Sequence, residues 1–331
     1  MIKLEVLIVL KKHSLILLAF LLILSLSSIV AVADSSFVGF SQVTIQSPFY
    51  VSLMESAERT AKEMGVKFVY LDAGNNIGKQ NNDVIDLITR GLDVLLLNPV
   101  DPEGVAPAMK RAEDNNVPVV TVDRPVEGKY EEAVFVGRKN YEMGVEAGKK
   151  AVELLGGEGN ASGKIIEIQG AAGGAVMRDR RDGFHSIVEK EEGIEIIQGP
   201  YCEYVRSQAI SAFQDLIQTH PDVDMVYAHN DDMALGAVQV LEQHGKIDDV
   251  YVIGIDGLME AIKAINDGRM DATVLNDPAY LGQLAVEVAL GVLKGKEYPE
   301  FVDAGTGLVT KDNAGEFYDP EKDFAEYIPE D

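Results

Sequence analysis

The sequence predicts an α/β fold made of two doubly wound domains, each with a parallel sheet covered by helices on both faces. Short apolar runs alternate with amphipathic stretches of helical period from Phe37 onward. Runs that are apolar throughout are typical of strands buried on both faces of a parallel sheet. The chain has more strand–helix repeats than one typical sheet holds, and its 331 residues, 47% of them hydrophobic, suffice for two cores.

The repeats follow one another in order along the chain. The first helix shows the pattern, because Phe49, Leu53 and Ala57 recur on one face and Gly65 ends the helix. The expected strands are residues 37–40, 67–71, 94–97, 117–122, 133–136, 164–168, 195–198, 225–228, 251–255, 272–275 and 306–311. The expected helices are residues 49–64, 79–89, 104–115, 141–155, 176–190, 207–219, 233–244, 259–267 and 282–293.

The charge and the rare residue types exclude several classes of function. The chain carries 29 Lys and Arg residues against 54 Asp and Glu residues, a formal net charge of -25, which would repel a nucleic acid backbone. Its single cysteine, Cys202, allows no intramolecular disulfide and no cysteine-based metal site. The sequence has no Walker loop, no Gly-x-Ser-x-Gly elbow and no histidine pair at metal spacing, so we expect no cofactor, metal or catalytic residue.

The N-terminus has the pattern of a secretory signal. Basic residues at 11–13 precede the apolar run 15–24, and small residues lead to Ala33 before Asp34. This pattern predicts a signal peptide over residues 1–33 and cleavage after Ala33. The alternative is an uncleaved membrane anchor, because the apolar stretch is just long enough to span a bilayer. No cysteine follows the run, so we expect a protein in the periplasm or cell envelope without a lipid anchor.

Polar and aromatic residues gather where the predicted strands end. In open parallel sheets, ligands bind beyond the carboxyl ends of the strands. Asn98, Asp123 with Arg124, the run from His229 to Asp232, and Asp256 with Gly257 each follow a strand, while the first strand leads to Ser47, Phe49 and Tyr50. Carboxylates, amides and arginines satisfy the hydroxyls of a sugar, and aromatic rings cover its C–H faces. The set therefore favours a sugar site.

Each of these residues also has a structural interpretation. Asp231 or Asp232 suits the N-cap of the following helix. Asp256 with Gly257 suits a turn, and Asp123 with Arg124 suits a surface ion pair. Four strand ends with the same chemistry favour a site over four unrelated local roles.

Five segments, at residues 47–65, 95–124, 165–184, 220–241 and 252–257, together resemble the periplasmic sugar-binding proteins of ABC transporters, in the ribose-binding-like group. The resemblance covers nearly all of residues 37–311, and the YAHNDDM stretch is also similar to relatives that bind galactofuranose. It implies a type I periplasmic binding protein fold, in which two Rossmann-like lobes are joined by three crossover strands and a sugar lies between them.

The resemblance also implies ligand contacts from both lobes. They are Ser47, Phe49, Tyr50, Asn98, Asp123 and Arg124 in the N-terminal lobe, Arg180, Tyr204, Asn230 and Asp256 in the C-terminal lobe, and Asn276 near a crossing. Ribose binders have Asn in place of Ser47, Phe in place of Tyr50 and Tyr204, and Gln in place of Asn276. These departures imply a monosaccharide in a wider sense: a pentose, a galactofuranose-like sugar or a polyol.

The same resemblance implies how the chain is divided. The N-terminal lobe would comprise residues 34–138 plus 277–305, and the C-terminal lobe residues 139–276 plus 306–311. We expect the acidic tail, residues 312–331, to lie on the surface or to be partly disordered.

The predicted function is that of a monomeric, non-enzymatic solute receptor that delivers a monosaccharide to the membrane permease of an ABC transporter. Three alternatives are a sugar or quorum-signal receptor for chemotaxis or signalling, a secreted carbohydrate enzyme, and a sugar-responsive transcription regulator. The enzyme would need Asp123 and Asp256 to flank a glycosidic bond. The regulator would need a DNA-binding segment and a basic face, where this chain has a signal-like segment and an acidic charge.

Overall fold

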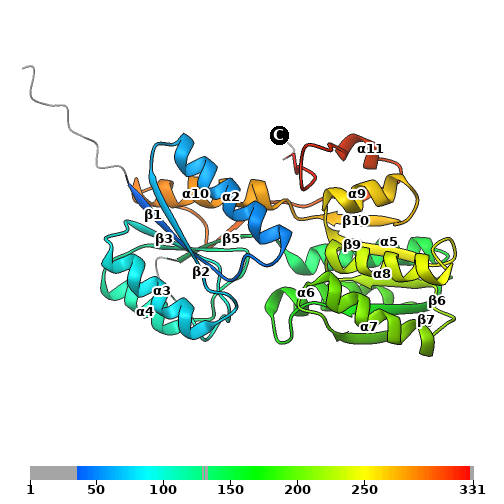
Figure 1. Ribbon diagram of the computed structural model, residues 1–331. Helices are drawn as coiled ribbons and strands as arrows, with labels where there is room; N and C mark the ends of the chain where they lie inside the picture. The colour runs from blue at the N-terminus through cyan, green and yellow to red at the C-terminus, as the bar shows by residue number, and fades with distance from the viewer. Residues whose placement is uncertain (1–35, 129, 131–132, 329–331) are drawn as a thin grey trace, which may run out of the picture. The chain divides into compact units, whose positions relative to one another are not determined.

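The computed structural model describes residues 36–128, 130 and 133–328, and these contain two six-stranded sheets with helices on both faces (Figure 1). The predicted signal peptide lies outside the described residues. We call each sheet with its helices a lobe. Two α/β lobes with mostly parallel strands are the predicted fold class, which is confirmed.

The sheet of the first lobe is parallel throughout and has the order β11-β5-β4-β3-β1-β2. Its strands are β1 (Phe37–Gln42), β2 (Lys67–Asp72), β3 (Val94–Leu97), β4 (Val119–Val122), β5 (Ala133–Gly137) and β11 (Phe301–Asp303). Helices α2 (Pro48–Glu63) and α10 (Pro278–Leu293) cover one face, and α3 (Ile77–Thr89) and α4 (Ala106–Asp114) cover the other (Figure 1). The strand order reverses between β1 and β3, where a doubly wound sheet has its ligand crevice.

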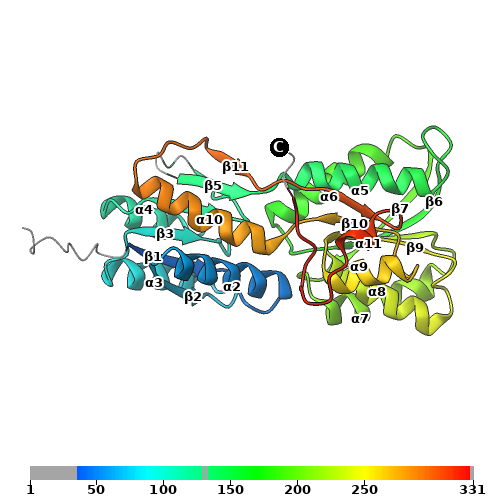
Figure 2. The ribbon, with the colours of Figure 1, turned by 90° about the horizontal axis from the view of Figure 1, so that it is seen from above.

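The sheet of the second lobe repeats this plan with the order β12-β10-β9-β8-β6-β7, in which only the pairing of β12 is antiparallel. Its strands are β6 (Ser162–Gln169), β7 (Gly193–Tyr201), β8 (Met225–Ala228), β9 (Tyr251–Asp256), β10 (Ala272–Leu275) and β12 (Leu308–Thr310). Helices α5 (Asn140–Leu154) and α6 (Ala175–Val188) lie on one face, and α7 (Arg206–Thr219), α8 (Asp231–His244) and α9 (Met259–Asn266) on the other (Figure 2).

Close helix packing fixes the helix that carries Arg180. A Cβ added to Gly144 of α5 would clash with the backbone oxygen of Arg180, and one added to Gly183 of α6 would clash with the backbone oxygen of Tyr141. The two helices therefore approach each other at a distance that only glycine allows. This contact holds α6, and with it Arg180, close against α5.

Three short segments connect the two sheets, and we call them the crossovers. The first follows β5, the second follows β10, and the third lies between β11 and β12. Backbone hydrogen bonds join the third to the strand ends from which the other two begin: Ala304 donates to the carbonyl of Gly137 at 2.8 Å, and Leu275 donates to that of Gly307 at 2.7 Å.

The acidic tail is more ordered than its composition predicts. It contains helix α11 (Ala314–Phe317), and both Phe324 and Ala325 are buried. Ala325 donates to the carbonyl of Gly257 at 2.8 Å, and the ring of Phe324 packs edge-on against Phe49 with centroids 6.2 Å apart. Most residues of the tail up to 328 are exposed at the surface, as expected, while Phe324 and Ala325 anchor it to the core.

Two short elements, β11 and α11, were missed by the sequence analysis. They contain three and four residues, too few to show a repeat of hydrophobic residues. Within the described ranges, no helix is long and apolar enough to cross a membrane.

Candidate functional site

A small pocket at the strand ends collects most of the predicted ligand residues. The empty space inside it and in front of its opening amounts to about 310 Å³. Residues of both lobes line it: Ser47, Phe49, Tyr50, Asp123, Val176, Arg180, Tyr204, Asn230, Asp256 and Asn276. Nine of the eleven predicted residues are in this set; Asn98 and Arg124 are not, and Val176 was not predicted.

The first turn of α2 supplies the aromatic part of the first lobe. Pro48 starts the helix, and Ser47 occupies the N-cap without a side-chain capping bond, so its hydroxyl stays available. The rings of Phe49 and Tyr50 meet edge to face with centroids 5.5 Å apart. Their positions at the helix start follow from the short connection between β1 and α2.

Asp123 directly follows β4 and is the acidic residue that the first lobe contributes to the pocket lining. Asn98, at the end of β3, donates to its Oδ2 at 3.5 Å, and Arg124 approaches the same oxygen with Nε at 3.8 Å. Arg124 also donates to the hydroxyl of Tyr50 at 2.5 Å and lines an adjoining cavity instead of the pocket itself. Asn98 and Arg124 therefore lie outside the pocket lining and contact the side chains of Asp123 and Tyr50, which belong to it.

Arg180 belongs to α6 and is the cationic residue that the second lobe contributes to the pocket lining. It donates from Nε to Oδ1 of Asn140 at 2.9 Å and from Nη1 to the carbonyl of His229 at 2.5 Å. Its Nη2 lies 3.5 Å from Oδ1 of Asp256. These contacts hold the guanidinium between α5, the residue after β8 and the end of β9.

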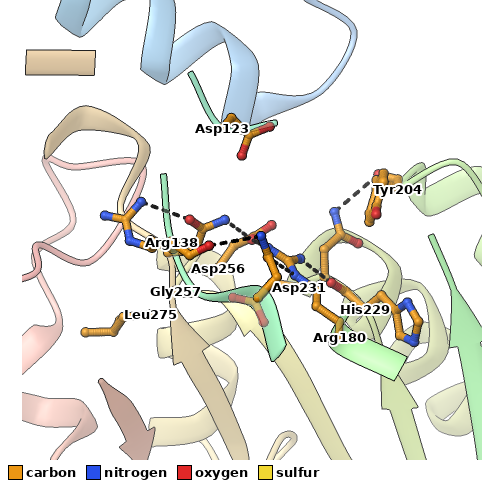
Figure 3. Close-up of polar contacts among 12 residues, drawn as sticks. Asp123, Arg138, Arg180, Tyr204, His229, Asp231, Asp256, Gly257 and Leu275 are labelled. Atoms are coloured by element: carbon orange, nitrogen blue, oxygen red, sulfur yellow. Dashed lines mark hydrogen bonds and ion pairs between the residues drawn. The ribbon is translucent and has the colours of Figure 1, made fainter. Parts of the chain in front are cut away.

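Asp256 ends β9 and is held by an amide as well as by Arg180. Asn276 donates from Nδ2 to its Oδ1 at 2.9 Å, and Oδ1 of Asn276 accepts from Arg138 at 2.9 Å. Figure 3 shows Asp256 with Arg138 on one side and Arg180 on the other. Arg138 could not be predicted from the sequence, because an arginine after an apolar strand carries no sign of a partner far along the chain.

The helix cap at α8 is a different residue from the two predicted. Asn230 is the N-cap, since its Oδ1 accepts from the backbone N–H of Met233 at 3.0 Å. Asp231 is buried and accepts from Thr273 and from the backbone N–H of Leu258. Asp232 pairs with Arg206 at 2.9 Å. The interpretation of Asp231 or Asp232 as the cap is therefore wrong, and Asn230 combines the cap with a place in the pocket wall.

Three pocket residues have backbones in the left-handed region. The φ angles are 65° for Asp123, 61° for Tyr204 and 128° for Asp256. Such conformations cost non-glycine residues about 1–3 kcal/mol each and concentrate at functional sites. Hydrogen bonds from Asn98 and Asn276 hold the carboxylates of Asp123 and Asp256 in place, whereas the Tyr204 hydroxyl has no partner.

Burial dominates the acid–base properties of these groups. It raises the pKa of Asp256 to about 6, against the opposing effect of the Arg180 charge and the Asn276 amide. Burial also raises the pKa of Asp123, and it raises that of the Tyr204 hydroxyl to about 12. Tyr204 is therefore a neutral hydrogen-bonding group at neutral pH.

Two of the predicted residues have buried polar atoms without a partner. These atoms are Oδ1 of Asn98 and the hydroxyl of Tyr204. Leaving a buried polar atom unbonded costs about 1–3 kcal/mol, so such atoms indicate a place for a polar ligand or water. Among the described residues, no cluster of acidic, histidine or cysteine side chains has the arrangement of a metal site.

The comparisons with known proteins agree with this geometry. The family model of the periplasmic binding protein domain matches residues 38–297. The ribose import binding protein RbsB of Bacillus subtilis is 36% identical over 83% of this chain and 87% of its own length. The galactofuranose-binding protein YtfQ of Escherichia coli is 29% identical over 77% of this chain and 81% of its own.

A solved structure extends the likeness to three dimensions. An ABC transporter solute-binding protein of Mycobacterium smegmatis, with bound glycerol, has a TM-score of 0.84 and 55% identity and covers 88% of this chain and 100% of its own. The fold, the family model and the relatives lead to one conclusion: the chain belongs to the periplasmic binding protein family.

Proposed function

We propose that this protein is an extracytoplasmic receptor that captures a monosaccharide or polyol between its lobes and delivers it to an ABC transporter permease. The observation that carries the proposal is the pocket, in which Asp123 of one lobe and Arg180 and Asp256 of the other surround a space beside Phe49 and Tyr50. Hydroxyls that both donate and accept satisfy such a mixed set of groups.

The relatives support a small polyhydroxylated ligand. Their names or titles give ribose, galactofuranose and bound glycerol. In this chain Tyr50 and Tyr204 add phenol hydroxyls to the pocket, and the Tyr204 hydroxyl has no partner. A ligand with a further hydroxyl near Tyr204 would satisfy that atom.

We infer that the protein binds its sugar without catalysis. A retaining or inverting glycosidase needs one carboxylic acid and one carboxylate facing the bond that breaks. Here Asp256 is bonded to Asn276 and faces Arg180, and Asp123 faces Asn98 and Arg124. These partners favour ionised carboxylates that accept from hydroxyls.

The lobes would move as rigid units about the crossovers, with boundaries at 138/139, 276/277 and 305/306. The protein would act as a monomer in the periplasm or cell envelope.

Export would remove residues 1–33, so N-terminal sequencing of exported protein should begin at Asp34. A sequence that still begins at Met1 would favour the membrane-anchor interpretation.

A thermal-shift panel tests the proposed function. D-ribose, L-arabinose, galactofuranose, myo-inositol and glycerol are added to the mature protein, and hits are titrated by calorimetry. A sugar at 100 times its Kd stabilises the protein by about 2.7 kcal/mol and raises its melting temperature. Lack of any shift and of any binding heat across a broad sugar panel would overturn the proposal.

A further inference from the structure

Arg138 connects all three crossovers through its side chain. It lies in the first crossover and is 4% exposed. Its Nη1 donates to Oδ1 of Asn276 and its Nη2 to the carbonyl of Asp277, both at 2.9 Å and both in the second crossover. Its Nε donates to the carbonyl of Gly305, in the third crossover, at 2.6 Å.

We propose that Arg138 is a positioning residue for the sugar site, which orients the Asn276 amide and through it the carboxylate of Asp256, and so joins the hinge to the pocket. The proposal rests on the proposed function only for the role of Asp256 in ligand binding. The contacts that carry it are independent of which sugar binds.

The orientation of the Asn276 amide is the first step. An amide has one acceptor and one donor end, and either end could face Asp256. Because Arg138 donates to Oδ1, the NH₂ group is turned toward Asp256, to which it donates at 2.9 Å. Without a cation at Oδ1, the amide loses the contact that selects this orientation.

A closed ring of hydrogen bonds is the second step. From Asp256 it continues through Arg180 to Asn140, whose Nδ2 donates to the backbone carbonyl of Arg138 at 3.4 Å. The ring thus returns to the crossover where it began. A change in the backbone of the first crossover would therefore affect Asp256 both through Asn276 and through Arg180.

The positive charge of Arg138 also acts on Asp256. Burial lowers the pKa of Arg138 to about 10, while the nearby carboxylates of Asp277, Asp123, Asp303 and Asp256 favour its charged form. The residue therefore stays cationic at neutral pH. The positive charges of Arg138 and Arg180 lower the pKa of Asp256 and favour its ionised form. The negative charges of Asp123 and Asp231 act on Asp256 in the opposite direction.

The neighbouring residue offers a matched control. Lys139 carries the same charge one position along the chain, but its side chain is 48% exposed and pairs with Glu142 and Asp303 at the surface. Lys139→Met removes one positive charge from the same crossover without touching Asn276. Arg138→Met removes the charge and all three side-chain bonds, and Arg138→Lys keeps the charge but loses the planar fork.

The test needs no ligand. Carbon-detected NMR follows the titration of the Asp256 carboxyl, with the signal assigned by Asp256→Asn. Arg138→Met should raise the Asp256 pKa by about half a unit or more relative to the parent protein, whereas Lys139→Met should leave it unchanged. An Asp256 titration that is identical in the parent, in folded Arg138→Met and in Lys139→Met would overturn the proposal.

A second readout covers the case in which Arg138→Met does not fold. In Arg138→Lys the side-chain NH₂ signals of Asn276, assigned by Asn276→Ala, should move from their parent positions because the amide is no longer held. Unchanged Asn276 signals in Arg138→Lys would contradict the positioning role.

Binding of D-ribose by calorimetry separates the two proposals. If the parent binds D-ribose, Arg138→Met should weaken it about tenfold and Lys139→Met less than twofold. Equal affinity in the parent and Arg138→Met would count against the proposal. If the parent binds no compound of the thermal-shift panel, the proposed function fails, while the two NMR readouts still decide the role of Arg138.

Discussion

At the residue scale, Asp256 shows how several forces act on one side chain. Its backbone has a φ of 128°, its carboxylate is buried, and its pKa is raised to about 6. Each of these features costs free energy in the empty protein. Arg180 and Asn276 offset part of that cost, and a bound hydroxyl would offset more.

The two acidic pocket residues should contribute most to affinity. Asp123→Ala and Asp256→Ala each remove an acceptor and leave Arg124 or Arg180 without its carboxylate partner, which costs about 1–3 kcal/mol or more and weakens binding about tenfold or more. Calorimetry on folded variants, with the sugar found by the panel, measures the change.

Asp232→Ala is the control for these variants. Asp232 pairs with Arg206 away from the pocket, so its loss should lower the melting temperature slightly and leave affinity unchanged. If both acidic pocket variants bind as tightly as the parent, the assignment of the site is wrong.

Affinity should also fall in acid because of Asp256. Its carboxyl group is the stronger, charge-assisted acceptor of hydroxyls when it is ionised, so binding should weaken as the pH falls below about 6. Binding constants measured between pH 5 and 8 should show this loss, and Asp256→Asn should remove most of it. A pH-independent affinity in the parent would contradict the role of Asp256.

Asp256 affects folding stability with the opposite sign. Its folded pKa lies above the ordinary value of 3.8, so the folded state holds the proton more tightly than the unfolded state. The stability that this proton provides is complete below the ordinary pKa and is lost as the pH rises toward about 6. Thermal melts of the parent and of Asp256→Asn in the empty state separate this effect from the effect on binding.

At the element scale, the tail acts as a packed segment. Phe324 forms a bridge with Leu258 and contacts Phe49, and the backbone N–H of Tyr327 donates to Oδ2 of Asp277 at 3.1 Å. The tail thus contacts the start of α2, the loop after β9 and the second crossover. These contacts lie outside the strands of both sheets, so they can open without unfolding the sheets.

Phe324→Ala should therefore destabilise the protein moderately. We expect a loss of about 2 kcal/mol, less than the 3–5 kcal/mol typical of a core phenylalanine, because the segment can detach. Thermal melts measure the loss, and hydrogen exchange should rise in residues 323–328. Tyr318→Ala, at a side chain that is 39% exposed, is the control and should change neither measurement. An unchanged melting temperature in Phe324→Ala would show that the tail contributes nothing to stability.

At the scale of the whole molecule, the pocket divides its contacts between two lobes. Each lobe supplies only part of the set, so a ligand gains most when both reach it. A ligand shifts an equilibrium between open and closed forms only by its difference in affinity for the two.

A saturating sugar should therefore reduce the radius of gyration. Small-angle scattering of the parent with and without the sugar found by the panel measures the change. The double variant Asp123→Ala, Asp256→Ala should show no reduction at the same sugar concentration. An unchanged radius in a saturated parent would contradict closure, provided that the empty protein is shown to be open by the same data.

The sequence by itself determined the class of fold, because apolar runs buried on both faces and amphipathic helices repeat over most of the chain. It also determined which strand ends carry polar residues, so Asp123, Asn230 and Asp256 could be named before any contact was known. These are local properties, which depend on residue type and on spacing along the chain.

Only the tertiary structure decided which distant residues meet. The sequence could not show that Arg138 bonds to Asn276, which is 138 positions away, or that Phe324 packs on Phe49. It also assigned the cap of α8 to an aspartate instead of Asn230. Several side chains can cap a helix or pair with a charge, and burial and long-range geometry select among them, which spacing along the chain does not encode.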